Sequence, residues 1–284
     1  MHTWHWQTWH DLPYLTCSLL APFPHGFFTQ SFGAMSLAEL GNVLSPTADV
    51  YRVRQVHGGT VLTPTEIGIQ QSSSSDGADL ADSSPLPEAD GILTDRSDQA
   101  VWVATADCVP ALVADVVTGQ VAAVHAGWRG TAAQILPEAI ARFQSEGSQL
   151  YNLRIALGPA IAGTVYQVST TVAAEVGKTV VPVAASIGNS SGPNIDDEPT
   201  TVLEQLEQLP TSPLLDDPMP SRARIDIRLV NQLQLELLGI CAEQVAVAPY
   251  CTYQDAEHFF SYRRDRLKKI QWSGIVSTSS QIVS

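Results

Sequence analysis

Three residues of the chain belong to types that bind transition metals, and each lies close to a glycine or a proline at the end of an apolar run. They are His57 in RVRQVHGG, Cys108 in ATADCVPAL and His125 in VAAVHAGWRGT. One thiolate and two imidazoles suit tetrahedral zinc with its fourth position open to water or substrate. Zinc lowers the pKa of a bound water toward about 7, which supplies hydroxide at neutral pH. The three residues therefore predict a catalytic metal site, in which Cu²⁺ can replace Zn²⁺ because copper has the higher intrinsic affinity.

The segments that carry these residues have the apolar, β-branched composition of strands. Strand ends that open into glycine-rich turns are places where side chains from separate strands meet in a cleft. Val121, Ala123 and His125 share one face of their strand because side chains alternate, so His125 extends a buried row. We expect strands at 51–62 (interrupted at Gly58-Gly59), 91–94, 101–105, 111–117, 121–125, 154–157 and 245–248.

Helical periodicity predicts helices at 37–44, 131–143, 201–209 and 226–238. Pro137 predicts a kink or an early break in the second helix, and Gly239 predicts the end of the fourth. The first ten residues, rich in Trp and His, predict an aromatic edge strand, with a metal-binding tail as the alternative.

The order of these elements predicts a mixed α/β (α+β) fold built of layers, in which one domain spans residues 1–284. Two stretches rich in Ser, Gly, Pro and acidic residues interrupt the pattern. We expect flexible loops there, at 70–88 and 186–220.

The composition narrows the class of protein. The chain has 284 residues, a hydrophobic share of 44% and a formal net charge of −14. This acidity argues against a nucleic-acid partner and against an anionic membrane surface. The sequence contains no apolar run long enough to span a membrane, and its N-terminus lacks the basic region of a signal peptide. We expect a cytoplasmic protein with reduced cysteines. The sequence leaves the oligomeric state open.

Cationic residues near the three donors point to an anionic small molecule. Arg129 follows His125 between a strand and a helix, where an arginine and free backbone N–H groups can hold an anion; a tight turn is the alternative. Asp107, beside Cys108, is a candidate to orient a ligand histidine or to accept a proton. The run HFFSYRRDR adds a candidate phosphate or ribose contact, or a salt-bridged surface turn, made by His258, Tyr262, Arg263, Arg264 and Arg266.

Seven runs along the chain resemble the laccase-domain family, also called multicopper polyphenol oxidase and described as a purine nucleoside phosphorylase family. They are HGFFTQ (25–30), QVHGGTV (55–61), ADGILTD (90–95), TADCVPALVAD (105–115), VAAVHAGWRGTA (121–132), LGPAI (157–161) and FFSYRRD (259–265). The resemblance implies a mixed α/β sandwich similar to cytotoxic necrotizing factor-like domains.

The resemblance also implies zinc bound by His57, Cys108 and His125, with Cys108, His125 and Asp107 as the catalytic residues. The implied reactions are phosphorolysis of adenosine, inosine and methylthioadenosine to a free base and a ribose 1-phosphate, and deamination of adenosine. The substrate contacts expected with purine nucleosides and inorganic phosphate are Arg54, Gln55, Arg129, Tyr262 and Arg263.

Two segments depart from the family pattern. Gln30 and the three residues after it stand where an arginine followed by glycines is usual, which leaves open whether that loop contacts an anion. The usual glycine-rich ending after SYRRD is replaced by Arg266-Leu267-Lys268-Lys269.

Three other functions are weighed. A trinuclear copper cluster needs many histidines, typically in H-x-H pairs, whereas this chain has seven histidines and no such pair; copper at the single site would give phenol oxidation as a minor activity. A thiol hydrolase would use Cys108 as nucleophile and His125 as its base. A protein that only holds a metal is the non-enzymatic alternative.

Overall fold

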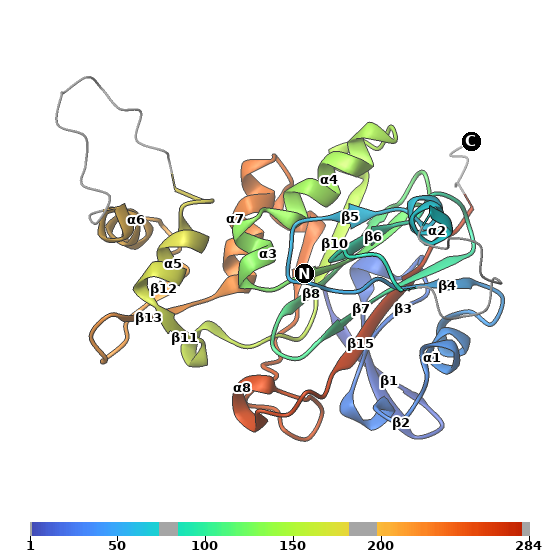
Figure 1. The fold of residues 1–284 in the computed structure, drawn as a ribbon, viewed down its shortest axis with the longest axis horizontal. Helices are drawn as coiled ribbons and strands as arrows, with labels where there is room; N and C mark the ends of the chain where they lie inside the picture. The colour runs from blue at the N-terminus through green and yellow to red at the C-terminus, as the bar shows by residue number, and fades with distance from the viewer. Residues whose placement is uncertain (1, 74–84, 182–197, 280–284) are drawn as a thin grey trace.

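The computed structural model describes residues 2–73, 85–181 and 198–279. Two six-stranded mixed sheets lie face to face at its centre (Figure 1). In spatial order the first sheet contains β1 (Trp4–Trp9), β2 (Leu12–Cys17), β3 (His25–Phe28), β15 (Gln271–Val276), β7 (Gln99–Thr105) and β4 (Asp49–Tyr51). The second contains β14 (Val245–Val247), β10 (Leu153–Leu157), β8 (Val109–Asp115), β9 (Val121–Ala126), β6 (Gly91–Leu93) and β5 (Val61–Leu62).

Helices cover the outer faces of the two sheets. The outer face of the first sheet is covered by α1 (Leu37–Leu44), and that of the second by α3 (Trp128–Ala132), α4 (Ile135–Ser145) and α7 (Ile227–Leu237). A three-stranded sheet, β11 (Gln167–Ser169), β13 (Arg222–Ile225) and β12 (Leu214–Leu215), lies at one end of the molecule with α5 (Thr170–Gly177) and α6 (Glu198–Glu207) (Figure 1). The remaining helices are α2 (Pro64–Ser73) and α8 (Tyr262–Asp265). Among the described residues, no helix is long and apolar enough to span a bilayer.

The strands of the second sheet are apolar on both faces because both faces are buried. In β9, Val121 and Ala123 pack between the two sheets, while Ala122 and Val124 pack under the helices. His125 has the same parity as Val121 and Ala123, so it continues the row between the sheets. The mixed, layered architecture predicted from the sequence is confirmed.

Most of the predicted elements are present. The helix at 37–44 has the predicted bounds and begins with a capping box formed by Ser36 and Glu39. The aromatic strand at the N-terminus is β1, which lies at the edge of its sheet. The helix predicted at 226–238 is α7, capped by Asp226, and Gly239 follows it with φ +89°.

The helix predicted at 131–143 is two helices, and the predicted break at Pro137 is wrong. The chain breaks between α3 and α4 at Gln134, which has φ +55°. Pro137 lies in the first turn of α4, where its missing N–H removes no helical hydrogen bond.

The segments predicted as flexible loops, 70–88 and 186–220, contain ordered elements among the described residues, and α6 lies where the helix at 201–209 was predicted. α2 continues to Ser73, and the backbone N–H of Arg54 donates to the carbonyl of Pro87. In the second segment α6 packs on α5 through the buried Leu206, and β12 pairs with β13. The remaining residues of these loops, 74–84 and 186–197, lie outside the described residues.

The interrupted strand predicted at 51–62 is also wrong. β4 pairs with β7 in the first sheet and β5 pairs with β6 in the second, so the chain between them crosses from one sheet to the other. His57 lies in this crossing with φ +62°, a conformation uncommon for a residue with a side chain. The crossing brings His57 to the ends of strands from both sheets.

Candidate metal and substrate site

A cavity of about 790 Å³ opens where the crossing segment meets the ends of β7 and β9. Its lining includes the three predicted ligands, the predicted catalytic groups and five of the predicted substrate contacts. These are Arg54, Gln55, His57, Asp107, Cys108, His125, Arg129, Tyr262 and Arg263. We call it the site cavity.

One group in the site cavity consists of the exposed His57, the half-buried Cys108 and the buried His125. One nitrogen or sulfur atom from each lies within 4.8 Å of the other two. Donor atoms at about 2.0–2.3 Å from one tetrahedral zinc ion are about 3.5 Å apart, so small side-chain movements bring the three onto one ion. The group can therefore hold a metal ion.

Asp90 organises this group from behind. Its carboxylate accepts hydrogen bonds from Nδ1 of His125 (2.8 Å) and from the backbone N–H groups of His57 (2.9 Å) and Gly58 (2.6 Å). Asp90 is fully buried and His125 is 3% exposed. Burial alone would raise the pKa of Asp90, but these hydrogen bonds hold it below its usual value. One carboxylate thus fixes both histidines and leaves Nε2 of His125 free to bind a metal.

The thiol of Cys108 has an environment that favours the thiolate. Burial raises its pKa, but hydrogen bonds and charge interactions with His125 and His57 bring it down to about 7. Burial also opposes charge on His125, yet Asp90 and Cys108 raise its pKa to about 9. Between about pH 7 and pH 9 the metal-free pair is therefore a thiolate and an imidazolium, and the thiolate is the form that binds a metal.

Gly127, which follows His125 and Ala126, leaves space for the thiol of Cys108. A Cβ placed on Gly127 would lie 2.8 Å from Sγ of Cys108 and 3.4 Å from Cδ2 of His57. Its φ of −72° is accessible to any residue, so this glycine is required by close approach rather than by its backbone conformation.

Asp107 does not orient a ligand histidine, which corrects one of its two predicted roles. Its two oxygens accept hydrogen bonds from Oγ1 of Thr252 (2.7 Å) and from the backbone N–H of Arg263 (2.7 Å). Asp107 itself has φ +91° and is 8% exposed. It joins the β7–β8 turn to the segment that begins α8.

Arg54 and Gln55 line the site cavity with polar groups that are already paired. The amide of Gln55 donates to the carbonyl of Ala104 and accepts from its N–H, at 2.8 and 2.7 Å. The guanidinium of Arg54 forms an ion pair with Glu88. Gln55 therefore attaches the crossing segment to β7.

Arg129 and Arg263 present their charge to the same cavity. The guanidinium of Arg129 stacks 4.2 Å from the centre of the Trp128 ring. That of Arg263 lies 5.0 Å from the ring of Tyr166 and donates to the carbonyl of Gln167. Among the described residues neither arginine has a carboxylate within ion-pair distance. Both are positioned to bind an anion.

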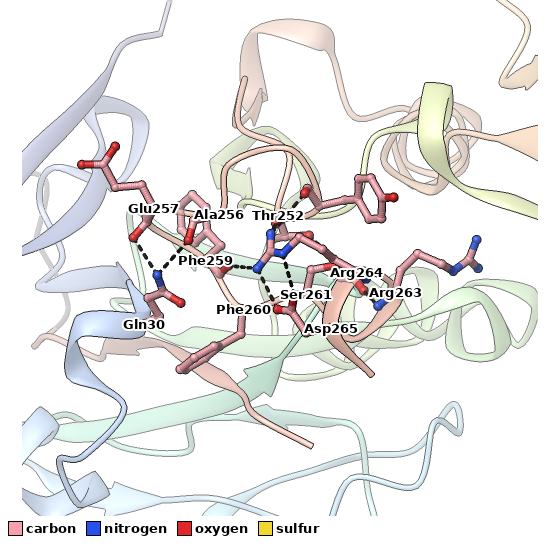
Figure 2. Close-up of polar contacts among 12 residues, drawn as sticks. Gln30, Thr252, Ala256, Glu257, Phe259, Phe260, Ser261, Arg263, Arg264 and Asp265 are labelled. Atoms are coloured by element: carbon pink, nitrogen blue, oxygen red, sulfur yellow. Dashed lines mark hydrogen bonds and ion pairs between the residues drawn. The ribbon is translucent and has the colours of Figure 1, made fainter. Parts of the chain in front are cut away.

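In the arginine-rich run Tyr262 also lines this cavity, whereas His258, Arg264 and Arg266 do not. Arg264 donates to the carbonyls of Thr252 and Phe259 and pairs with Asp265, whereas Arg263 extends away from that loop (Figure 2). Gln30 donates to the carbonyls of Ala256 and Glu257, at 2.9 and 2.7 Å (Figure 2). The loop at Gln30 thus supports the C-terminal segment and is not part of the cavity lining.

Sequence reasoning missed three features of the site. Asp90 was visible as a carboxylate directly before a buried strand in ADGILTD. Tyr166 lines the cavity beside Cys108; burial and the charge of Cys108 raise its pKa to about 12. No local pattern marked this tyrosine. Lys268 and Lys269 also line the cavity, and the sequence had marked them as a departure from the family pattern.

The fold and site define a layered α/β protein with a His-Cys-His group that could hold a metal ion, in a cavity lined by cationic side chains. The family described as multi-copper polyphenol oxidoreductase laccase matches residues 36–275, and the chain belongs to this family. A purine nucleoside phosphorylase of Synechocystis sp. is 48% identical over 277 residues, which cover 96% of this chain and 97% of that protein. A purine nucleoside phosphorylase of Streptomyces coelicolor is 32% identical over 182 residues, covering 64% of this chain and 61% of that protein.

Solved structures show the same fold. YlmD from Geobacillus stearothermophilus superposes with a TM-score of 0.74 at 23% identity, covering 96% of this chain and 99% of that one. The hypothetical protein YfiH of Bacillus licheniformis gives 0.68 at 22% identity, covering 93% and 96%.

Proposed function

We propose that this chain is a zinc-dependent purine nucleoside phosphorylase that also deaminates adenosine. Its substrates are adenosine, inosine and methylthioadenosine, which phosphate cleaves to the free base and a ribose or methylthioribose 1-phosphate. The observation that carries the proposal is a metal-binding group and two arginines without carboxylate partners in one cavity. The naming of a relative at 48% identity as a purine nucleoside phosphorylase supports it.

In the proposed phosphorolysis, Arg129 and Arg263 bind the inorganic phosphate. A phosphate oxygen forms the bond to C1′ while the bond from C1′ to the purine nitrogen breaks, and the departing purine takes a proton. Two guanidinium groups hold the phosphate against C1′, where positive charge develops in the transition state. The cavity volume of about 790 Å³ is within the range of roughly 300–1,000 Å³ typical of ligand sites, so a nucleoside and phosphate fit together.

In the proposed deamination, His57, Cys108 and His125 bind the metal ion. A zinc ion held there would supply a Lewis acid for the addition of water to C6 of adenine, from which the 6-amino group would leave as ammonia. Asp107 is the carboxylate proposed to move protons; its two hydrogen bonds leave further lone pairs on its oxygens. Tyr262 and Gln55 are the proposed contacts to the nucleoside, and Arg54 is the proposed contact at the cavity edge.

A thiol hydrolase is the second candidate because one specific arrangement favours it. Asp90, His125 and Cys108 form a chain of hydrogen bonds in which the imidazole lies between a buried carboxylate and a thiol of lowered pKa. The same order of acid, base and nucleophile occurs in cysteine proteases. A metal on the same atoms would block this chemistry, so the two mechanisms exclude each other.

Copper-dependent phenol oxidation, the activity in the family's description, is proposed as a minor activity at most. Within the described residues, His57, Cys108 and His125 are the one group of three His, Cys or acidic donors close enough to share an ion. A multinuclear copper cluster needs more ligands than this group offers.

The test is product analysis after incubation of the purified protein with inosine and, separately, with adenosine, with and without phosphate, before and after removal of the metal by a chelator. The proposal expects hypoxanthine and ribose 1-phosphate from inosine only when phosphate is present, and loss of adenosine deamination after chelation that zinc restores. Adenosine deamination that survives chelation but stops on alkylation of Cys108 would establish the thiol mechanism instead.

A further inference from the structure

Six cationic side chains line the site cavity, out of fifteen lysines and arginines in a chain of net charge −14. Asp107 is the single carboxylate among the described lining residues, and the protein itself engages both of its oxygens. The lining cations are Arg52, Arg54, Arg129, Arg263, Lys268 and Lys269. One dianionic phosphate and a neutral nucleoside do not account for this much positive charge.

The six cations divide into two sets by their position. Arg129 lies two residues after Gly127, the glycine beside Cys108, and the backbone of Arg263 is bonded to Asp107. The other four belong to two segments, 52–55 and 267–270, which flank the end of β7. Gln55 bonds Ala104 on one side of this strand, while β15, which begins at Gln271 opposite Thr105, pairs with its other side. The four cations therefore stand on both sides of the cavity mouth.

Three of these four outer cations have no carboxylate within ion-pair distance in the part of the chain that the structure describes. They are Arg52, Lys268 and Lys269; Arg54 pairs with Glu88. The ammonium of Lys269 lies 5.3 Å from the ring centre of Phe260, and this contact holds the lysine side chain against the protein. Unpaired cations at the edge of a cavity attract an anion at the position they face.

The lysine segment is fixed at both ends. At its start, Arg264 is bonded into the preceding loop (Figure 2), and Arg266 turns the chain with φ +57°. At its end, Gln271 accepts a hydrogen bond from the N–H of Phe260 at 2.9 Å. The segment between these anchors spans four residues, so its two lysines remain near the mouth.

We propose that these outer cations form a second anion site, which binds the 5′-phosphate of a purine nucleoside 5′-monophosphate. The inference rests on the proposed phosphorolysis and names a further class of substrate for it. With inosine 5′-monophosphate, inorganic phosphate forms the bond to C1′ as the bond to N9 breaks. The electron pair leaves with the purine, which takes a proton, and the products are hypoxanthine and ribose 1,5-bisphosphate.

The experiment compares kcat/KM for inosine and for inosine 5′-monophosphate at saturating inorganic phosphate. The test protein carries Lys268→Gln and Lys269→Gln, and the matched control is Lys178→Gln, an exposed lysine outside the cavity lining. We expect wild type to cleave the monophosphate and the double variant to lower the ratio of monophosphate to inosine kcat/KM by about tenfold, since two charge-assisted contacts are lost. The control variant keeps the wild-type ratio.

Two results would overturn the inference. One is cleavage of inosine without cleavage of the monophosphate. The other is an equal loss on both substrates in the double variant, which would mean that the lysines only attract inorganic phosphate. If no nucleoside is cleaved, the proposed function fails, and calorimetric binding decides the mouth site separately. Binding of inosine 5′-monophosphate over inosine, weakened in the double variant, would support the site, and equal binding would reject it.

Discussion

The two ends of the site cavity are built differently. At the inner end, Cys108 and the buried His125 lie at strand ends, the exposed His57 lies on the crossing between the sheets, and a fully buried carboxylate, Asp90, accepts hydrogen bonds from His125 and from the backbone of His57. At the mouth, Lys268 and Lys269 are exposed and lie on an irregular segment after a four-residue helix. The inner end is therefore fixed by the core, whereas the mouth is free to vary without cost to the fold.

This difference indicates a division of roles. A metal centre needs fixed donor distances and a fixed tautomer, both of which the buried hydrogen bonds of Asp90 provide. Selection among anionic substrates needs charge at an adaptable edge, and exposed lysines provide that. Substitutions at the inner end should abolish function, and substitutions toward the mouth should change substrate preference.

The largest effect is expected for Cys108→Ala. This change removes the thiolate donor, so the protein should lose its metal, and turnover that depends on the metal should fall by about a thousandfold. Elemental analysis measures the metal content, and the rate of adenosine deamination measures the metal-dependent turnover. Cys241→Ala is the matched control, because Cys241 is an exposed thiol outside the cavity lining. Full metal content and normal turnover in the Cys108 variant would refute the metal site.

The next effect is expected for Asp90→Asn. The amide keeps the shape of the carboxylate but lacks its negative charge, which strengthens the hydrogen bond accepted from His125. Metal affinity should therefore fall by about 10- to 100-fold. Competition with a chelator of known affinity measures this. The control is Asp95→Asn, an exposed carboxylate that accepts from the N–H of Thr65 and the amide of Gln99. Equal loss in both variants would mean that Asp90 acts through general stability alone.

The sequence was sufficient to predict a layered mixed α/β fold and candidate metal ligands at strand ends, because alternation and residue type are local properties. Val121, Ala123 and His125 illustrate this: their shared parity predicted the row that the structure shows between the sheets. The sequence also predicted that the three donors converge, through glycine-rich turns, and the structure places their ligand atoms together.

The errors of the sequence analysis came from long-range structure. The segment 51–62 looks like one strand, yet it leaves one sheet and joins the other, which depends on partners distant in sequence. Asp90 and Asp107 are both acids next to predicted strands, and no local pattern says which of them binds His125. That choice is made by the antiparallel pairing of β6 with β9, which brings Asp90 beside His125.

The third effect is on the reactivity of Cys108 in the metal-free protein at pH 7, which should be about fifty-fold higher than that of a thiol with the usual pKa. With its pKa lowered to about 7, about half of the thiol is ionised at pH 7, against about 1% at the usual value of 9.0. Alkylation should rise with pH through about 7. The positive charge of His125 persists to about pH 9, so the ion pair exists between these values and is lost on either side. A midpoint near 9 would contradict the predicted pairing; added zinc should protect the thiol.

The smallest effect is expected between the two ends of the cavity, at Arg129. Its guanidinium stacks on Trp128 and has no carboxylate partner among the described residues. Arg129→Gln should therefore raise the KM for inorganic phosphate by about tenfold, the loss of one charge-assisted contact, while metal content stays at the wild-type level. Arg154→Gln is the control, because Arg154 bonds backbone carbonyls outside the cavity. A loss of metal in the Arg129 variant would mean that the metal ligands and the anion site depend on each other, and it would refute the proposed division of roles.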